Sequence, residues 1–307
     1  MTTIVRTEGL TKSYGRLTVV DDVDLEVFPG DVFGFLGPNG SGKTTTIRML
    51  LGLVAPSSGR AELFGRAMPD DAHRTLQDVG ALVEGPAFYP TMSGRRNLAV
   101  FDAAGHNSSR STRRRRIADV LDRVGLGSVD RRPVRAYSLG MRQRLGLAAA
   151  LIRQPRLLML DEPTNGLDPQ GIREIRALLA QLATEGTTVF LSSHLLGEVE
   201  LICTRAAMMA QGRLVAQDTV EHLLAPTGRL VIDTPDTDAA VALLLRHSAH
   251  VERDGARVRV ELNGQPPEAL NHALVHAGVR VRELVVERRS LEDAYLNLTG
   301  GSGDARR

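Results

Sequence analysis

Eight residues, GPNGSGKT at Gly37–Thr44, carry the strongest structural signal in the chain. They satisfy the pattern G-x-x-x-x-G-K-[ST], in which glycines let backbone N–H groups curl around phosphate oxygens. The apolar run Val32–Leu36 precedes them, and the helix-forming segment Thr45–Leu53 follows. A strand, a glycine-rich loop and a helix N-terminus in this order are typical of a phosphate-binding loop. We therefore expect an α/β nucleotide-binding domain.

The side chains of this loop suit a nucleotide triphosphate with its magnesium ion. Lys43 offers a compact ammonium for the β- and γ-phosphates, and Thr44 offers a hydroxyl to Mg²⁺. Only Lys12 and Lys43 are lysines among the 38 basic residues, so a lysine here stands out. A glycine-rich turn with chance residues is the alternative, and the flanking strand and helix argue against it. The predicted ATP contacts are Gly37, Pro38, Asn39, Gly40, Ser41, Gly42, Lys43, Thr44 and Thr45.

A second motif, LLMLDEPT at Leu157–Thr164, follows further along the chain. An apolar strand delivers Asp161 to its carboxyl end, where open α/β sheets bind ligands. Asp161 can hold Mg²⁺ through water, and Glu162 is the predicted general base for the water that attacks the γ-phosphate. Paired acids at a strand end are often a helix cap, but beside a phosphate-binding loop they favour hydrolysis.

The third element is YSLGMRQR at Tyr137–Arg144, directly before a helical run. Together with the two motifs above, it resembles the ATP-binding cassette (ABC) family. In that family an LSGGQ signature binds the γ-phosphate held by the opposite subunit. Ser138 and Gly140 match the signature here, whereas Leu139 and Met141 depart from it. A Ser-x-Gly core at a helix start still offers a hydroxyl and backbone N–H groups to an anion. An ordinary capped helix is the alternative.

The resemblance implies further site residues. Asp168, in Asn165–Asp168, matches the D-loop and would contact a partner cassette. His194, after the strand-like TTVFLS, matches the switch histidine, although lone histidines are more often structural. Tyr14, in TKSYG, matches the aromatic residue that stacks on adenine, with an ordinary packed tyrosine as the competing interpretation.

One position departs from the family pattern. Within VGALVEGPAFYP, at Val79–Pro90, Glu84 occupies the place of the glutamine-loop glutamine. Its carboxylate could approach Mg²⁺ or the attacking water, which makes it a predicted metal and nucleotide contact. The alternative is that Glu84 caps the turn before Pro86 and points to solvent.

The resemblance also implies the domain organisation. Residues 2–217 would form the ABC ATP-binding domain, with a helical subdomain at about 92–153. After a boundary at Pro226–Gly228, the order strand, helix, two strands, helix, strand matches a small α+β ferredoxin-like domain. We expect this accessory domain at 227–299, as in bacterial drug and antibiotic exporters, and a disordered tail at 300–307.

Composition limits the partners, membrane segments and disulfides that the chain can have. The 38 basic and 36 acidic residues nearly balance, so no nucleic-acid partner is expected. The run Arg113–Arg116 reads as a solvated helix start, with contact to anionic lipid or nucleic acid as the alternative. The most apolar stretch, Leu145–Ile152, is too short for a membrane span, and no secretory signal is visible. A single cysteine, Cys203, excludes an intrachain disulfide.

The implied function is ATP binding and hydrolysis that powers export through a separate integral membrane permease. Two cassettes would sandwich ATP, so a second copy or a close paralogue is expected, at the cytoplasmic face of the cell membrane. The alternative is a soluble ABC-type ATPase not coupled to transport. Translation factors of that kind carry two cassettes per chain, and DNA-maintenance ATPases carry a long coiled coil; neither feature is present in this sequence. The transported substrate is not encoded in any visible motif.

Overall fold

The computed structural model describes residues 2–85, 87–105, 109–129, 131–248 and 250–300. The chain divides into two compact units, which are described separately below. The first holds the chain up to Val220 together with its last residues from Leu298, and the second holds Glu221–Asn297.

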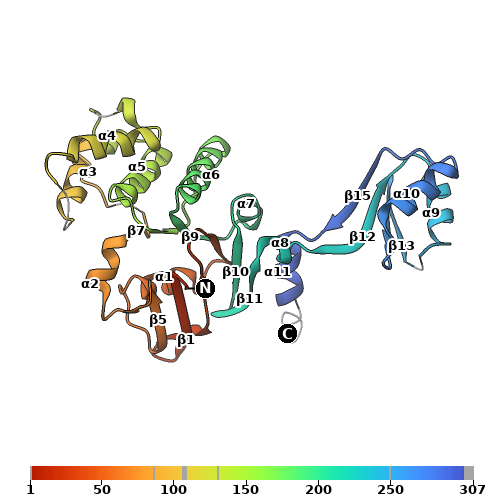
Figure 1. Cartoon of the computed structure of the whole chain (residues 1–307), viewed down its shortest axis with the longest axis horizontal. Helices are drawn as coiled ribbons and strands as arrows, with labels where there is room; N and C mark the ends of the chain where they lie inside the picture. The colour runs from red at the N-terminus through yellow and green to blue at the C-terminus, as the bar shows by residue number, and fades with distance from the viewer. Residues whose placement is uncertain (1, 86, 106–108, 130, 249, 301–307) are drawn as a thin grey trace. The chain divides into compact units, whose positions relative to one another are not determined.

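The first unit is built on a six-stranded sheet with the order β11-β10-β4-β9-β8-β7 (Figure 1). Five strands run parallel, and only β11 pairs antiparallel, with β10. The strands β4 and β8 are short and almost wholly apolar because both faces of a parallel sheet are covered. The bounds of the strands in this sheet are β4 Val32–Leu36, β7 Val79–Leu82, β8 Leu157–Asp161, β9 Thr188–Ser193, β10 Arg205–Ala210 and β11 Arg213–Thr219.

Helices and a second sheet cover the six-stranded sheet. The antiparallel sheet has the order β2-β1-β5-β6, with β3 also paired to β1. Phe33 and Phe35 of β4 pack on Phe190 of β9, with ring centroids 5.5 and 5.4 Å apart, in the core between the layers. The elements are β1 Val5–Tyr14, β2 Leu17–Val23, β3 Glu26–Val27, β5 Ser58–Leu63, β6 Arg66–Met68, α1 Lys43–Leu50, α2 Ala72–Thr75, α6 Pro169–Thr184 and α7 Leu196–Glu200. Helix α8, Val220–Leu223, begins at the last residue of this stretch of the first unit and continues into the second.

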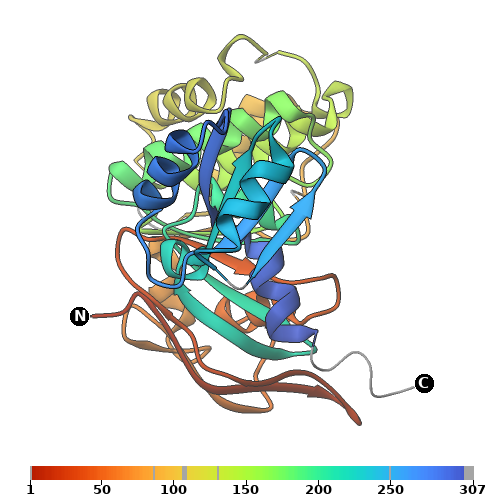
Figure 2. The ribbon, with the colours of Figure 1, turned by 90° about the vertical axis from the view of Figure 1, so that its right-hand side faces the viewer.

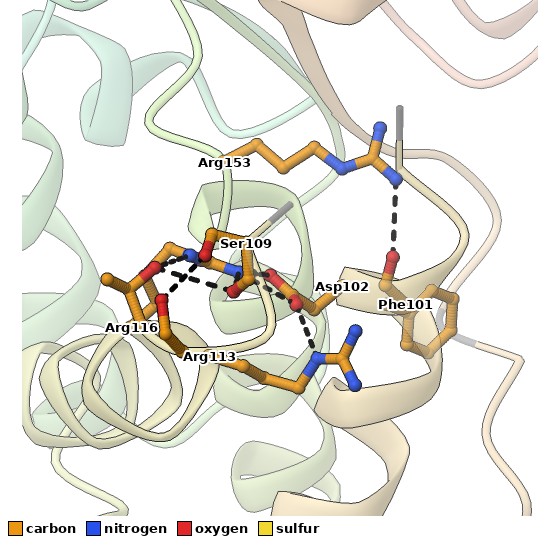
Figure 3. A network of polar contacts seen from close by, with 8 residues as sticks. Phe101, Asp102, Ser109, Arg113, Arg116 and Arg153 are labelled. Carbon is orange, nitrogen blue, oxygen red and sulfur yellow. Dashed lines mark hydrogen bonds and ion pairs between the residues drawn. The ribbon is translucent and has the colours of Figure 1, made fainter. Parts of the chain in front are cut away.

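Three helices within the expected helical region pack on one another: α3 Gly94–Ala103, α4 Arg113–Arg123 and α5 Leu139–Leu151. Asp102 is fully buried there, and its carboxylate accepts hydrogen bonds from Arg113 and Arg116, at 2.8 Å from each (Figure 3). The interpretation of Arg113–Arg116 as a merely solvated helix start is therefore wrong for two of its four residues. The sequence alone does not show that a buried carboxylate on the preceding helix recruits them.

The second unit is a four-stranded antiparallel sheet with the order β13-β14-β12-β15. In chain order the strands are β12 Pro226–Asp233, β13 Val251–Asp254, β14 Arg257–Glu261 and β15 Glu283–Arg288. Helices α9 Thr237–Leu244 and α10 Pro267–His276 lie between these strands in the sequence and beside them in the fold (Figure 2). The apolar side chains of both helices share one core with the sheet. This arrangement is the split βαβ predicted from the element order.

Two details of the C-terminal region depend on local chemistry. Pro226–Gly228, predicted above as a domain boundary, lies inside β12, where the register shifts between Pro226 and Leu230 and Gly228 has φ 74°. A bulge of this kind accommodates proline and glycine within a strand. Helix α11, Leu291–Thr299, begins with a capping box: Ser290 Oγ accepts from the N–H of Asp293, and the Asp293 carboxylate accepts from the N–H of Ser290. Most of the predicted disordered tail, 301–307, lies outside the described residues.

Two further expectations concern membrane and redox chemistry. Within the described part of the chain, no helix has both the length and the hydropathy that a membrane span requires. Cys203 is buried, and this burial raises the pKa of its thiol.

Candidate functional site

The phosphate-binding loop connects the carboxyl end of β4 to the start of α1. Gly42 immediately precedes α1 with φ 103°, and a Cβ there would lie 2.6 Å from the carbonyl oxygen of Val19. A side chain at this position would therefore meet β2 and strain the backbone. The Oγ of Ser41 is buried and has no hydrogen-bond partner among the described residues. An orphaned hydroxyl in a glycine-rich loop fits a phosphate oxygen.

The side chain of Lys43 turns back toward the first residues of the phosphate-binding loop. Its Nζ donates to the carbonyl oxygens of Gly37 and Pro38, at 2.7 and 3.1 Å, and lies 3.6 Å from Oε1 of Glu162. Only 5% of its surface is exposed. Burial lowers the pKa of this ammonium, while the charges of Glu162 and Asp161 oppose that shift. The structure thus places the loop lysine against the carboxylate predicted as general base.

Thr44 and Asp161, which are 117 residues apart in the sequence, meet in the site. The hydroxyl of Thr44 donates to Oδ2 of Asp161 at 2.9 Å, and Ser192 donates to Oδ1 at 2.5 Å. Asp161 and Ser192 are register partners at the ends of the parallel strands β8 and β9. A hydroxyl and a carboxylate beside a phosphate-binding loop are the hard oxygen donors that Mg²⁺ prefers. This donor set therefore fits the predicted metal.

Glu162 is held at three points. Its N–H donates to Oγ of Ser192 at 3.0 Å, and its Oε2 lies 2.7 Å from Nδ1 of His194. Its Oε1 is buried, faces Lys43, and has no hydrogen-bond partner among the described residues. The backbone is left-handed at φ 50°, which is uncommon for a residue with a side chain and recurs at functional sites. One carboxylate oxygen is thus anchored, and the other is aimed into the loop.

The predicted partner-facing residues sit at helix starts. Ser138 caps α5, its Oγ accepting from the N–H of Met141 at 3.2 Å, and Gly140 lies in the first turn. Asp168 caps α6, its Oδ1 accepting from the N–H of Gly171 at 2.9 Å. The described contacts do not bring Ser138, Gly140 or Asp168 to the Lys43–Glu162 cluster of the same chain.

Tyr14 and Glu84 also lie outside this cluster. Tyr14 ends β1 with half of its surface exposed, and the ammonium of Lys12 lies 5.0 Å from its ring centroid. Glu84 has φ 60° and pairs with Arg48 on α1. The described contacts do not connect Glu84 to Thr44 or Asp161.

Sequence reasoning missed Ser192, which joins Asp161 to the backbone of Glu162. The signal was available, because parallel neighbouring strands that end at the same level bring their last residues together. It also missed Gln143, whose side-chain amide donates to the carbonyl of Pro163 at 3.0 Å and so ties α5 to the loop after Glu162. No sequence spacing predicts that contact.

These features define a P-loop nucleotide hydrolase of the ATP-binding cassette class. A model of the ABC transporter family matches residues 20–165. The bacitracin transport ATP-binding protein BcrA of Bacillus licheniformis is 40% identical over 98% of this chain and 99% of its own length. The daunorubicin resistance ATP-binding protein DrrA3 of Streptomyces coeruleorubidus is 37% identical over 97% of this chain and 96% of its own.

A solved structure agrees with these relatives. The cbiO1 protein of Clostridium perfringens, described as part of an ABC transporter complex, superposes with a TM-score of 0.67 at 26% identity, covering 80% of this chain and 96% of that chain. The chain belongs to the ABC transporter family: it is an ATP-binding and ATP-hydrolysing subunit of a transporter. This confirms the predicted α/β cassette fold and its function over the soluble, transport-independent alternative.

Proposed function

We propose that this subunit powers the export of an antibiotic or a similar drug through a separate membrane permease. The observation that carries the hydrolytic part is the position of Glu162 between Lys43 and His194. The export of antibiotics is supported by the relatives, whose names specify bacitracin transport and daunorubicin resistance. Both relatives align along nearly the whole chain, including residues 227–299, which we assign to an accessory domain after the cassette at 2–217.

The hydrolytic step follows from the cluster. The γ-phosphate lies against Lys43 and the loop N–H groups, and the Oε1 of Glu162 orients a water toward the phosphorus. The water oxygen bonds to that phosphorus, the bond to the β,γ-bridging oxygen breaks, and Glu162 accepts the proton, giving ADP and phosphate. His194 keeps the carboxylate in place through Oε2. Thr44 and Asp161 would hold Mg²⁺, which neutralises phosphate charge when bound.

A second cassette completes the site in this proposal. Ser138 and Gly140 present a hydroxyl and backbone N–H groups at the start of α5, which suits a γ-phosphate held by another copy. Asp168 would contact that copy, and Tyr14 would stack on adenine. Glu84 would approach Mg²⁺ or the water only after it leaves Arg48. The complex would sit at the cytoplasmic face of the membrane, attached through the permease.

Drug resistance in a sensitive bacterial host tests the export proposal. The chain is expressed together with its membrane permease, and growth is measured in bacitracin and in daunorubicin. We expect resistance to at least one drug with the wild-type chain, and none with Lys43→Ala at equal expression. Sensitivity to both drugs, with a complex that still hydrolyses ATP, would contradict the assignment to these two drug classes.

A further inference from the structure

Lys12 makes two contacts at the exposed end of the β1–β2 hairpin. Its Nζ lies 5.0 Å from the ring centroid of Tyr14 and donates to the carbonyl oxygen of Ala55 at 2.7 Å. Residues two apart on a strand point to the same face, which explains why the ammonium reaches the ring. The carbonyl comes from a segment 43 residues away. The cation is therefore fixed over one face of the tyrosine from outside the hairpin.

This part of the hairpin adjoins the phosphate-binding loop. Lys12 pairs in register with Val20, and Tyr14 pairs with Leu17. A Cβ on Gly42, at the start of α1, would lie 3.3 Å from Cγ2 of Val20. Val20, the register partner of Lys12, thus lies next to the loop, and Tyr14 lies two residues after Lys12 on the same strand. An exposed ring at that place can receive the base of a nucleotide whose phosphates occupy the loop.

The residue type at position 12 is also unusual for this chain. Arginine fills 36 of the 38 basic positions, and the two exceptions are Lys12 and Lys43. Lysine carries a compact point charge, whereas arginine spreads its charge over a planar fork. A compact ammonium can satisfy one carbonyl and one ring face at the same time. Under the proposed function, the two lysines would lie at the two ends of the same nucleotide.

We propose that Lys12 is a positioning residue for adenine: it fixes the Tyr14 ring from one side and leaves the other face for the base. The proposal rests on the proposed stacking of Tyr14 on adenine. A ring that is held before ATP arrives loses less side-chain freedom on binding. A cation on one face of an aromatic ring is itself stabilising. Lys12 therefore raises the affinity for ATP without touching the phosphates.

Binding of ATP and of inorganic tripolyphosphate to the full chain tests the proposal. The variants are Lys12→Met, which keeps the length of the side chain, Lys12→Arg, Tyr14→Ala and the double variant Lys12→Met/Tyr14→Ala. We expect Lys12→Met to weaken ATP binding about threefold to tenfold and to leave tripolyphosphate binding unchanged. Lys12→Arg should lie between Lys12→Met and wild type. In the Tyr14→Ala background, Lys12→Met should cause no further loss.

Two results would overturn the role of Lys12 while leaving the adenine stacking intact. One is unchanged ATP affinity in Lys12→Met where Tyr14→Ala weakens binding. The other is an equal loss for ATP and tripolyphosphate, because the lysine would then act through charge on the phosphates. If Tyr14→Ala itself leaves ATP affinity unchanged, the stacking fails and the role of Lys12 falls with it.

Discussion

The Oε2 atom of Glu162 lies 2.7 Å from Nδ1 of His194, so two residues that follow neighbouring parallel strands hold one another. Glu162 has an uncommon left-handed backbone, and this contact fixes the direction of its side chain. The second carboxylate oxygen, Oε1, then has one direction left, toward Lys43. The pair explains how a short loop after β8 can hold the proposed general base in a single orientation.

Removing the His194 side chain should leave the Glu162 carboxylate without the contact that fixes its direction. We expect His194→Ala to lower steady-state ATP hydrolysis by at least about tenfold, since a positioned base contributes 10²–10⁴-fold in typical enzymes. ATP affinity should change little because Lys43 and Thr44 remain. Both are measured on the purified transporter complex, with the exposed His73→Ala as control. Wild-type turnover in His194→Ala would show that the contact has no catalytic consequence.

Lys43→Ala should weaken nucleotide binding and hydrolysis together. The ammonium is the cation buried in the phosphate-binding loop, and the hydroxyl of Thr44 cannot replace its charge. Calorimetric titration with ATP in Mg²⁺ measures the loss, with Arg115→Ala as a control that removes one charge from a highly exposed site. Equal affinities for the wild type and Lys43→Ala would refute the phosphate-cradle interpretation of the loop.

The helical subdomain should depend on one buried carboxylate. Asp102→Ala removes the carboxylate that Arg113 and Arg116 share, although both arginine side chains keep about a quarter of their surface exposed. We expect the free energy of unfolding to fall by about 2–4 kcal/mol, at or below the range for a broken buried ion pair. Urea denaturation followed by circular dichroism measures it. Arg115→Ala, on the same helix, should cost less than about 1 kcal/mol, and equal effects of the two changes would contradict the structural role.

Glu84 offers a test of the glutamine-loop position. Glu84→Gln should keep most hydrolysis, because glutamine is the usual residue there in the family that the motif resembles. Glu84→Ala should damage drug transport more than ATP affinity, since the loop contacts of Lys43 are untouched. ATPase rate and transport are measured for both variants in the complex. Harmless Glu84→Ala would mean that pairing with Arg48 at the surface is all that Glu84 does.

The elements around the motifs were predictable because their chemistry is local. The strand Val32–Leu36 has the predicted bounds, and the apolar strand predicted to deliver Asp161 to its carboxyl end is β8, Leu157–Asp161. Continuous apolar runs of four or five residues with turn residues on one side have few other stable solutions in an α/β fold. The ferredoxin-like order of the C-terminal strands was predictable for the same reason, since each element has its own periodicity.

Contacts between distant segments were not predictable. Asp102 with Arg113 and Arg116, and Gln143 with Pro163, depend on how helices pack, and no periodic pattern encodes that packing. The position of Pro226–Gly228 within β12 was not predictable either, because proline and glycine signal both turns and bulges.

The central claim is that Glu162 supplies the base for ATP hydrolysis, and Glu162→Gln in the purified complex tests it most directly. The amide keeps the shape of the side chain and loses the proton acceptor. We expect ATP affinity near that of the wild type, turnover reduced by at least about 10²-fold, and ATP-dependent dimers of the isolated subunit that persist on size-exclusion chromatography. Unchanged steady-state hydrolysis would contradict the claim and assign the base to another residue.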